Sequence, residues 1–189
     1  MVPPNRRSFE SKNTIDPSTY TFASVLICCY PNYSGHYYFP IIKRQKYDGV
    51  HSNQMALPGG KRQLTDDTLW DTALRECKEE LGINTHSIEC VGKLSEVFIP
   101  PSQFRVTPFV AKLNNIPPPF ILQQREVAKV YSVSLNHLQN WNVSYQKTDL
   151  KNASMEMPGF ILESEFIWGA TAMILFEFRQ VLKQLIVGN

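Results

Sequence analysis

The stretch LPGGKRQLTDDTLWDTALRECKEELGI, residues 57–83, organises the chain. Its second half predicts a helix that begins near Asp67. Gly82 suits the left-handed backbone conformation that commonly ends a helix, so we expect the helix to stop there. The side chains on the arc expected to pack against the core, at about 100° per residue, are Trp70, Ala73, Leu74, Cys77 and Leu81.

Three glutamates, Glu76, Glu79 and Glu80, share the helix face next to this apolar arc. Like charges four residues apart cost a helix roughly 0.2–0.5 kcal/mol, and acids in the last turn oppose the helix dipole by roughly 0.3–1 kcal/mol. A solvated surface helix can carry such a row, which is the alternative interpretation. Arg75 and Lys78 relieve part of the repulsion, but a hard divalent cation such as Mg²⁺ would relieve more.

Together with the glycines before the helix, this pattern resembles the signature of the Nudix hydrolase family: a glycine, an acid, then Arg-Glu, Glu-Glu and a glycine. Two features, Asp66 in place of Glu and a gap to Arg75 that is one residue longer than usual, are typical of the coenzyme A diphosphatase branch. The resemblance implies an α/β protein with a Nudix-type α/β/α sandwich and a mixed β-sheet. The residues that match the signature in order are Gly60, Asp66, Arg75, Glu76, Glu79, Glu80, Gly82 and Ile83.

A second motif of that branch precedes the first one. The segment KRQKYDGVHSNQMALPGG, residues 43–60, is similar to it in part. The positions that match are Arg44, His51 and Gln54, and those that replace the Ser, Arg and Gly of the common form are Gln45, Gly49 and Asn53.

The resemblance implies roles for the acids in cutting a diphosphate linkage with Mg²⁺ or Mn²⁺. Glu76 and Glu80 would be the principal metal ligands, and Glu79 a further ligand or the base. A main-chain carbonyl near Gly60 would help bind the metal. Glu126, just before a predicted strand, is a second candidate base.

The resemblance also implies residues that orient the metal-binding acids and residues that contact the substrate. Arg75 would orient the carboxylates, through a pair with Asp66. The predicted contacts to substrate come from Arg44, His51, Gln54 and Lys61. A histidine in a loop is commonly a plain exposed polar residue, and Gln54 could equally satisfy backbone groups at the turn.

The substrate that the resemblance implies is coenzyme A or its acyl forms, cut to 4'-phosphopantetheine and adenosine 3',5'-bisphosphate. One alternative is another nucleoside diphosphate derivative, such as a nucleotide sugar or a dinucleotide. A second is a non-catalytic Nudix module that senses a nucleotide. A third, a purely structural domain, would leave the motif spacing as coincidence. Because binding alone does not require three metal-directed acids, we predict an enzyme, a Nudix diphosphatase.

Length and composition limit the remaining possibilities. A chain of 189 residues with 43% hydrophobic content is long enough for one domain, predicted over residues 19–189. The polar, proline-bearing residues 1–18 predict an N-terminal arm. The net charge of +2 gives no indication of a nucleic-acid partner, and no uninterrupted apolar run predicts a membrane span. Four cysteines without metal-site spacing fit a reducing, cytoplasmic setting. The sequence is also compatible with a homodimer.

Outside the motif, alternation and turn residues predict the order of the remaining elements. A polar segment, residues 141–159, is expected to be a hairpin or a flexible loop beside the ligand. The expected strands are 21–30, 36–44, 54–57, 87–98, 104–113, one that begins near Val127, and 160–168, and the closing helix is 170–186.

Overall fold

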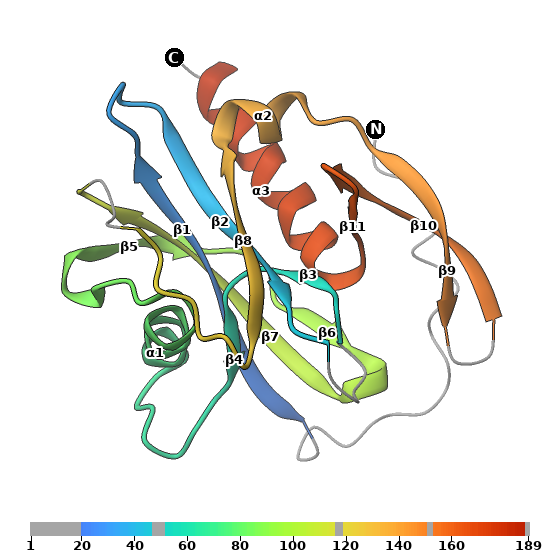
Figure 1. Cartoon of the computed structure of the whole chain (residues 1–189), viewed down its shortest axis with the longest axis horizontal. Coiled ribbons are helices and arrows are strands. Elements are labelled where there is room, and N and C mark those ends of the chain that lie inside the picture. The colour runs from blue at the N-terminus through green and yellow to red at the C-terminus, as the bar shows by residue number, and fades with distance from the viewer. Residues whose placement is uncertain (1–19, 47–51, 116–118, 151–152, 188–189) are drawn as a thin grey trace.

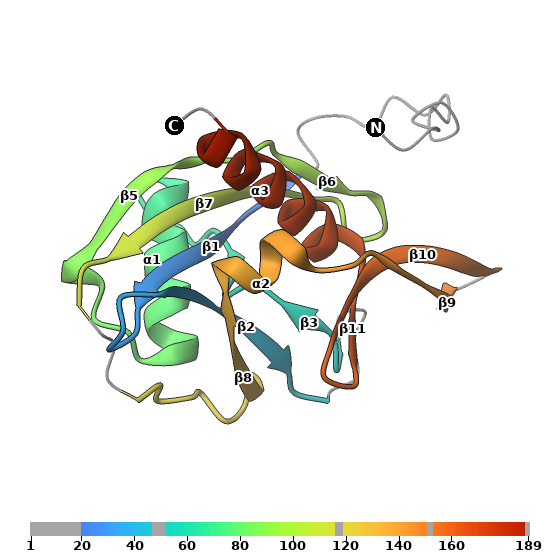
Figure 2. The same cartoon turned by 90° about the horizontal axis from the view of Figure 1, so that it is seen from above.

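The computed structural model describes residues 20–46, 52–115, 119–150 and 153–187. The strands are β1 Thr21–Pro31, β2 Tyr37–Arg44, β3 Met55–Ala56, β4 Gly59–Lys61, β5 Ile88–Lys93, β6 Val97–Ile99, β7 Phe104–Leu113, β8 Val127–Ser134, β9 Ser144–Leu150, β10 Ala153–Leu162 and β11 Glu165–Ile167. The α-helices are α1 Leu69–Leu81, α2 Leu135–Asn140 and α3 Gly169–Val187. Figures 1 and 2 show α1 and α3 on opposite faces of the main sheet.

The main sheet is mixed, as predicted. Within the described residues it has eight strands in the order β3-β2-β1-β7-β5, with β4 paired to β1, β6 to β7 and β8 to β2. The β1–β7 pair is parallel and the other pairs are antiparallel. A smaller sheet, in the order β11-β10-β9, includes a hairpin that projects from the body of the molecule (Figure 2).

Strand β1 is buried on both faces, which explains its continuous apolar sequence. Ile27 and Cys29 pack in the cluster that includes residues of α3, whereas Leu26 and Cys28 pack in the cluster that includes α1. The adjacent cysteines are therefore core residues. All four cysteines of the chain are free thiols.

The sheet divides close to the turn that joins the end of β1 to the start of β2. These two strands are in register only at Tyr30 with Tyr38 and at Pro31 with Tyr37. Further along, β1 pairs with β4, while β2 pairs with β3 and β8. The division leaves β4 on one half of the sheet and the start of β8 on the other, so side chains from α1 can reach both.

Helix α1 forms where the motif predicted it, although it begins two residues later than expected. Thr68 caps its N-terminus in a capping box with Asp71, and Gly82 ends it in the left-handed conformation at φ 69°. Three of the five residues predicted to face the core are fully buried, and the other two, Trp70 and Leu74, are half-buried. The fully buried ones are Ala73, Cys77 and Leu81.

The single strand predicted over residues 87–98 is wrong, because the chain forms β5 and β6 with a break between them. Lys93 pairs with Phe109 and Val97 with Val106, so this segment has one more residue than the facing part of β7. Pro108 lies in that facing part and has no backbone N–H for a ladder hydrogen bond. The extra residue is accommodated as a bend instead of a continuous strand.

The last strand predicted over residues 160–168 is also wrong. The chain reverses at Glu163, which has a φ of 55°, and β11 folds back on β10 with Leu162 opposite Glu165. The segment 141–159 takes the hairpin option, with β9 paired to β10. Helix α2 was not predicted, and α3 matches the expected closing helix.

None of the helices in the described ranges is both long and apolar enough to cross a membrane.

Gly59 is the residue where β4 approaches β1 most closely. Its φ is 151°, and a Cβ atom there would lie 2.2 Å from the Ser24 carbonyl oxygen and 2.6 Å from the Val25 Cα. We expect Gly59→Ala to lower the free energy of unfolding by about 1–3 kcal/mol, because backbone atoms would have to move. Urea unfolding measures the effect.

The matched control is Gly92→Ala, since a Cβ at Gly92 would meet nothing within 4 Å. This variant should stay within about 0.5 kcal/mol of the parent protein. Equal unfolding midpoints for the Gly59 and Gly92 variants would contradict the described packing of β4 on β1.

Candidate functional site

Three acidic side chains meet where the sheet divides. Glu76 and Glu80 come from α1, and Glu126 directly precedes β8. One carboxylate oxygen of each lies within 4.8 Å of the others. Glu80 is buried, Glu76 is partly buried and Glu126 is exposed, so the cluster extends from the core to the surface. Sequence reasoning treated Glu126 only as a candidate base and missed that it joins the other two acids.

The Pro58-Gly59-Gly60 turn brings main chain up against these acids. The Gly59 amide donates a hydrogen bond to Glu80 Oε2 at 2.8 Å. A Cβ atom on Gly60 would lie 2.5 Å from Glu76 Oε1, which is closer than real Cβ contacts allow. The space that a side chain would need at Gly60 is therefore filled by the Glu76 carboxylate.

The charges of the cluster are only partly compensated within the protein. Burial raises the pKa of Glu80 to about 8, although Arg44 and the Gly59 amide act in the opposite direction. Burial also raises the pKa of Glu76, against the influence of Arg75. Arg44 is 4.0 Å from Glu80 Oε1, too far for a close ion pair. Three adjacent carboxylates, of which Glu76 is paired with Arg75 at 2.8 Å, fit a hard divalent cation such as Mg²⁺ or Mn²⁺.

Arg75 ties this cluster to the loop before α1. Its Nε donates to Asp66 Oδ1 at 2.9 Å and its Nη2 donates to Asp66 Oδ2 at 3.0 Å, so the predicted pair is confirmed as a contact. Its Nη1 donates to Glu76 Oε1 at 2.8 Å and to Glu79 Oε2 at 3.0 Å. A fork of fixed donors therefore sets the orientation of acids on both sides of it.

Asp66 is almost completely buried at 5% exposure. Besides Arg75, it accepts hydrogen bonds from the Thr72 hydroxyl at 3.0 Å and from the Gln63 amide at 2.9 Å. The Arg75 guanidinium and these donors hold the pKa of Asp66 well below its usual range, against the effect of burial. Asp66 is thus a buried anion with several charge-stabilising partners.

Glu79 lies apart from the other predicted metal ligands. Its side chain is 52% exposed and forms an ion pair with Arg75. It is not among the three acids whose oxygens cluster in the described part of the chain. Its role as a further ligand or as the base stays a prediction.

The predicted substrate-binding residues are only partly brought together. Arg44 Nη2 donates to the Gly59 carbonyl at 3.1 Å, and the Arg44 amide donates to the Gln54 carbonyl at 3.0 Å. Lys61 is exposed at the end of β4 and lines a hollow next to Glu76. His51 lies outside the described residues.

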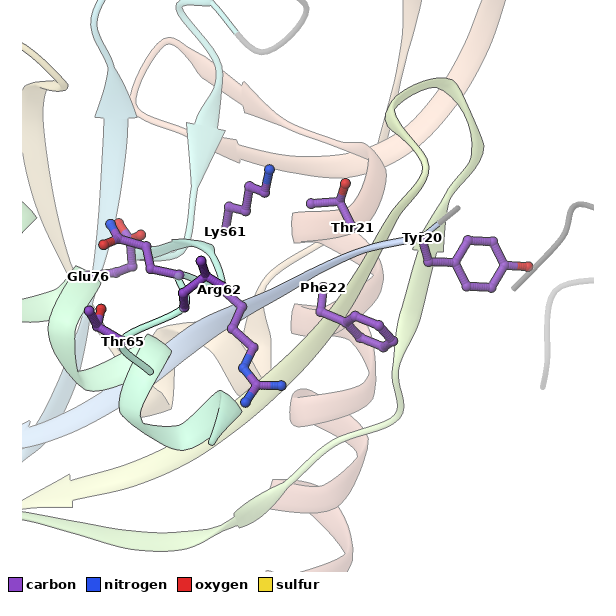
Figure 3. A pocket seen from close by; sticks show the side chains of 9 residues that line it. Tyr20, Thr21, Phe22, Lys61, Arg62, Thr65 and Glu76 are labelled. Carbon is purple, nitrogen blue, oxygen red and sulfur yellow. The ribbon is translucent and has the colours of Figure 1, made fainter. Parts of the chain in front are cut away.

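The same hollow contains aromatic side chains that sequence reasoning did not identify. Tyr20 and Phe22, at the start of β1, line it together with residues 61–65 and Glu76 (Figure 3). Phe22 belongs to the apolar strand predicted over residues 21–30, yet it is 42% exposed. The sequence carries no signal for this exposure, because Phe22 stands directly before the buried residues of the same strand.

We expect Asp66→Asn to lower the free energy of unfolding by about 2 kcal/mol at pH 7, because charge-assisted hydrogen bonds are lost. Since the pKa of Asp66 is lower in the folded than in the unfolded protein, its stabilisation is present above about pH 4 and is lost as the pH falls further. Urea unfolding between pH 3 and 7 should therefore show parent and variant converging at low pH. Asp67→Asn, at the exposed neighbouring residue, is the control. A difference that does not change with pH would contradict the charge on Asp66.

Comparison with known proteins agrees with this geometry. A family model for the NUDIX domain matches residues 24–151. The Nudix hydrolase NudL of Yersinia pestis (strain Pestoides F), described as uncharacterized, is 33% identical over 143 residues, which cover 74% of this chain and 70% of the relative. NudL of Yersinia pseudotuberculosis serotype O:1b has the same identity and coverage.

Solved structures share the fold at low sequence identity. The Nudix hydrolase RenU from M. smegmatis has a TM-score of 0.54 at 16% identity, covering 87% of each chain. An Ap4A hydrolase from C. elegans has a TM-score of 0.51 at 21% identity, covering 64% of this chain and 84% of that one. The family model covers more than half of the chain and the NudL relatives exceed 30% identity, so this protein belongs to the Nudix hydrolase family.

Proposed function

We propose that this Nudix hydrolase cuts the diphosphate linkage of coenzyme A or its acyl forms, giving 4'-phosphopantetheine and adenosine 3',5'-bisphosphate. The observation that carries the reaction class is the cluster of Glu76, Glu80 and Glu126 against the Gly60 main chain. Hydrolysis of a diphosphate requires compensation of the charge on its oxygens. The acids of this site would provide that compensation by binding a divalent cation.

Each residue of the cluster has a proposed task. Glu76 and Glu80 would hold Mg²⁺ or Mn²⁺, with Glu126 as a third ligand and the main chain near Gly60 beside them. A bound cation of this kind neutralises diphosphate charge and lowers the pKa of a bound water. Arg75 keeps the Glu76 carboxylate in place through the hydrogen bond from its Nη1.

Two carboxylates remain candidates for accepting the proton of the attacking water. Glu79 is exposed and joined to Arg75 through Oε2. Glu126 is exposed at the rim of the cluster, and its carbonyl is tied to the Gln45 amide at 2.8 Å. Either position would let a carboxylate approach a water from the open side of the site.

The choice of coenzyme A is supported by the form of the motif. Asp66 and the longer gap before Arg75 are the features that resemble the coenzyme A branch, and the buried pair between these residues shows that the longer loop is well packed. Arg44, from the upstream motif, lies beside Gly59 and Glu80 at the site. A nucleotide sugar or a dinucleotide is the competing substrate class.

The proposal is tested by incubating the purified protein with coenzyme A, nucleotide sugars and dinucleotides, each with Mg²⁺ or Mn²⁺, and identifying products by mass. We expect metal-dependent cleavage of coenzyme A. Glu80→Gln should lower kcat/KM by more than about 100-fold, because even residues that only support a metal ligand cost 10–100-fold. Glu89→Gln, at an exposed site on β5, should leave the rate unchanged.

Circular dichroism checks that both variants keep the fold. Cleavage of nucleotide sugars but not of coenzyme A would contradict the substrate. Unchanged cleavage by Glu80→Gln would contradict the proposed metal site.

A second variant tests the close approach of the main chain to the acids. Gly60→Ala would place a methyl group on the Glu76 carboxylate. We expect it to weaken Mn²⁺ binding, measured by isothermal titration calorimetry, by roughly 10–100-fold. Gly92→Ala should bind Mn²⁺ like the parent protein, and an equal affinity for the Gly60 variant would show that Glu76 does not hold the cation.

A further inference from the structure

A hollow of about 950 Å³ opens beside the acid cluster (Figure 3). Residues 20–22, residues 61–65 and Glu76 line it. Glu76 also belongs to the acid cluster, so the hollow lies directly beside the cluster. A ligand whose diphosphate lies at the acids would therefore extend into this space. Its volume is that of ordinary small-molecule sites, roughly 300–1,000 Å³.

Two flat side chains lie side by side here, Phe22 on β1 and Arg62 directly after β4. The Arg62 amide donates to the Phe22 carbonyl at 2.9 Å, one step beyond the register pair of Ala23 and Lys61. Phe22 and Arg62 are therefore cross-strand neighbours, whose side chains lie on the same side. Figure 3 shows both pointing one way, while Lys61 and Thr21 point the other way.

Alternation along the strand connects this pair to the acids. Gly60 is two residues before Arg62, so a side chain at Gly60 would point to the same side. That direction leads to the Glu76 carboxylate, only 2.5 Å from a Cβ placed on Gly60. The rise of a strand puts Arg62 roughly 7 Å beyond Gly60, a separation that a ribose can bridge.

Hydrogen bonds hold Arg62 in place, but Arg62 and Phe22 do not stack on each other. The Arg62 guanidinium donates to the Asp66 carbonyl from Nε and Nη2 and to the Asp67 carbonyl from Nη2 at 2.8 Å. Phe22 is 42% exposed. Within the described residues, no cation–π contact joins the two. An aromatic face and a planar cation thus border open space, and both are surfaces on which a nucleobase stacks.

We propose that Phe22 and Arg62 form the base-binding slot of this enzyme, with the substrate's nucleobase stacked on the Phe22 ring. The slot rests on the proposed function, because it takes the diphosphate to lie at the acids. It adds the direction of the substrate: the nucleoside end occupies this hollow and the pantetheine end leaves on the other side of the acids.

The test uses two ligands that differ by the base. Adenosine 5'-monophosphate and ribose 5-phosphate are titrated into the full chain by isothermal titration calorimetry with Mg²⁺ present. We expect Phe22→Ala to weaken binding of the adenosine ligand roughly 10-fold, within the range found for base-stacking aromatic residues. Binding of ribose 5-phosphate should not change, and Phe22→Trp should restore the adenosine affinity.

The control is Tyr33→Ala, which removes another exposed ring, 93% accessible and at the opposite end of β1. It should leave both affinities unchanged. With coenzyme A as substrate, Phe22→Ala should raise KM and leave kcat unaltered, which a general loss of folding would not do.

The slot and the proposed function fail in different ways. If coenzyme A is cleaved and Phe22→Ala changes neither the adenosine affinity nor KM, the slot is wrong and the function stands. If no diphosphate is cleaved but Phe22→Ala selectively weakens adenosine binding, the slot stands and the function is wrong. If the parent protein binds both ligands equally, the base is not recognised and the slot is overturned.

Discussion

The fold depends on one close approach, that of the Gly59-Gly60 main chain to two carboxylates of α1. Gly59 donates to buried Glu80, and Gly60 leaves room for the Glu76 carboxylate. The approach brings a buried acid to a position where its charge is unfavourable, since burial raises the pKa of Glu80 to about 8. A helix placed only for stability would bury an apolar residue there. The protein instead keeps acids that a divalent cation would stabilise.

The surrounding structure follows from holding these groups together. The sheet divides between β1 and β2, so that β4 and the start of β8 lie on either side of α1 and bring Glu126 to the other acids. Arg75 and Asp66 then fix the loop before the helix. Because Asp66 is buried and held by three other residues, this loop has little freedom. The site is thus built on rigid elements.

Local sequence determined much of the fold and of the site. The span of α1 and its end at Gly82 follow from periodicity and cap residues, and the contact of Arg75 with Asp66 was implied by the family resemblance. Features that depend on contacts between segments far apart in the sequence could not be predicted in this way. Glu126 joins the acids only because β8 pairs with β2, and Phe22 is exposed although the strand that it belongs to is largely buried. The reversal at Glu163 uses a left-handed residue that is not glycine, so it had no turn signal in the sequence.

The central claim is that the clustered acids hold a divalent cation, and the stability of the protein as a function of free Mn²⁺ tests it most directly. An ion that binds only the folded state adds about 2.7 kcal/mol at 100 times its dissociation constant. We expect urea unfolding to shift by an amount of this order for the parent protein, with little shift for Glu80→Gln and none with added K⁺. Equal shifts for parent and variant, or no shift at saturating Mn²⁺, would contradict the account.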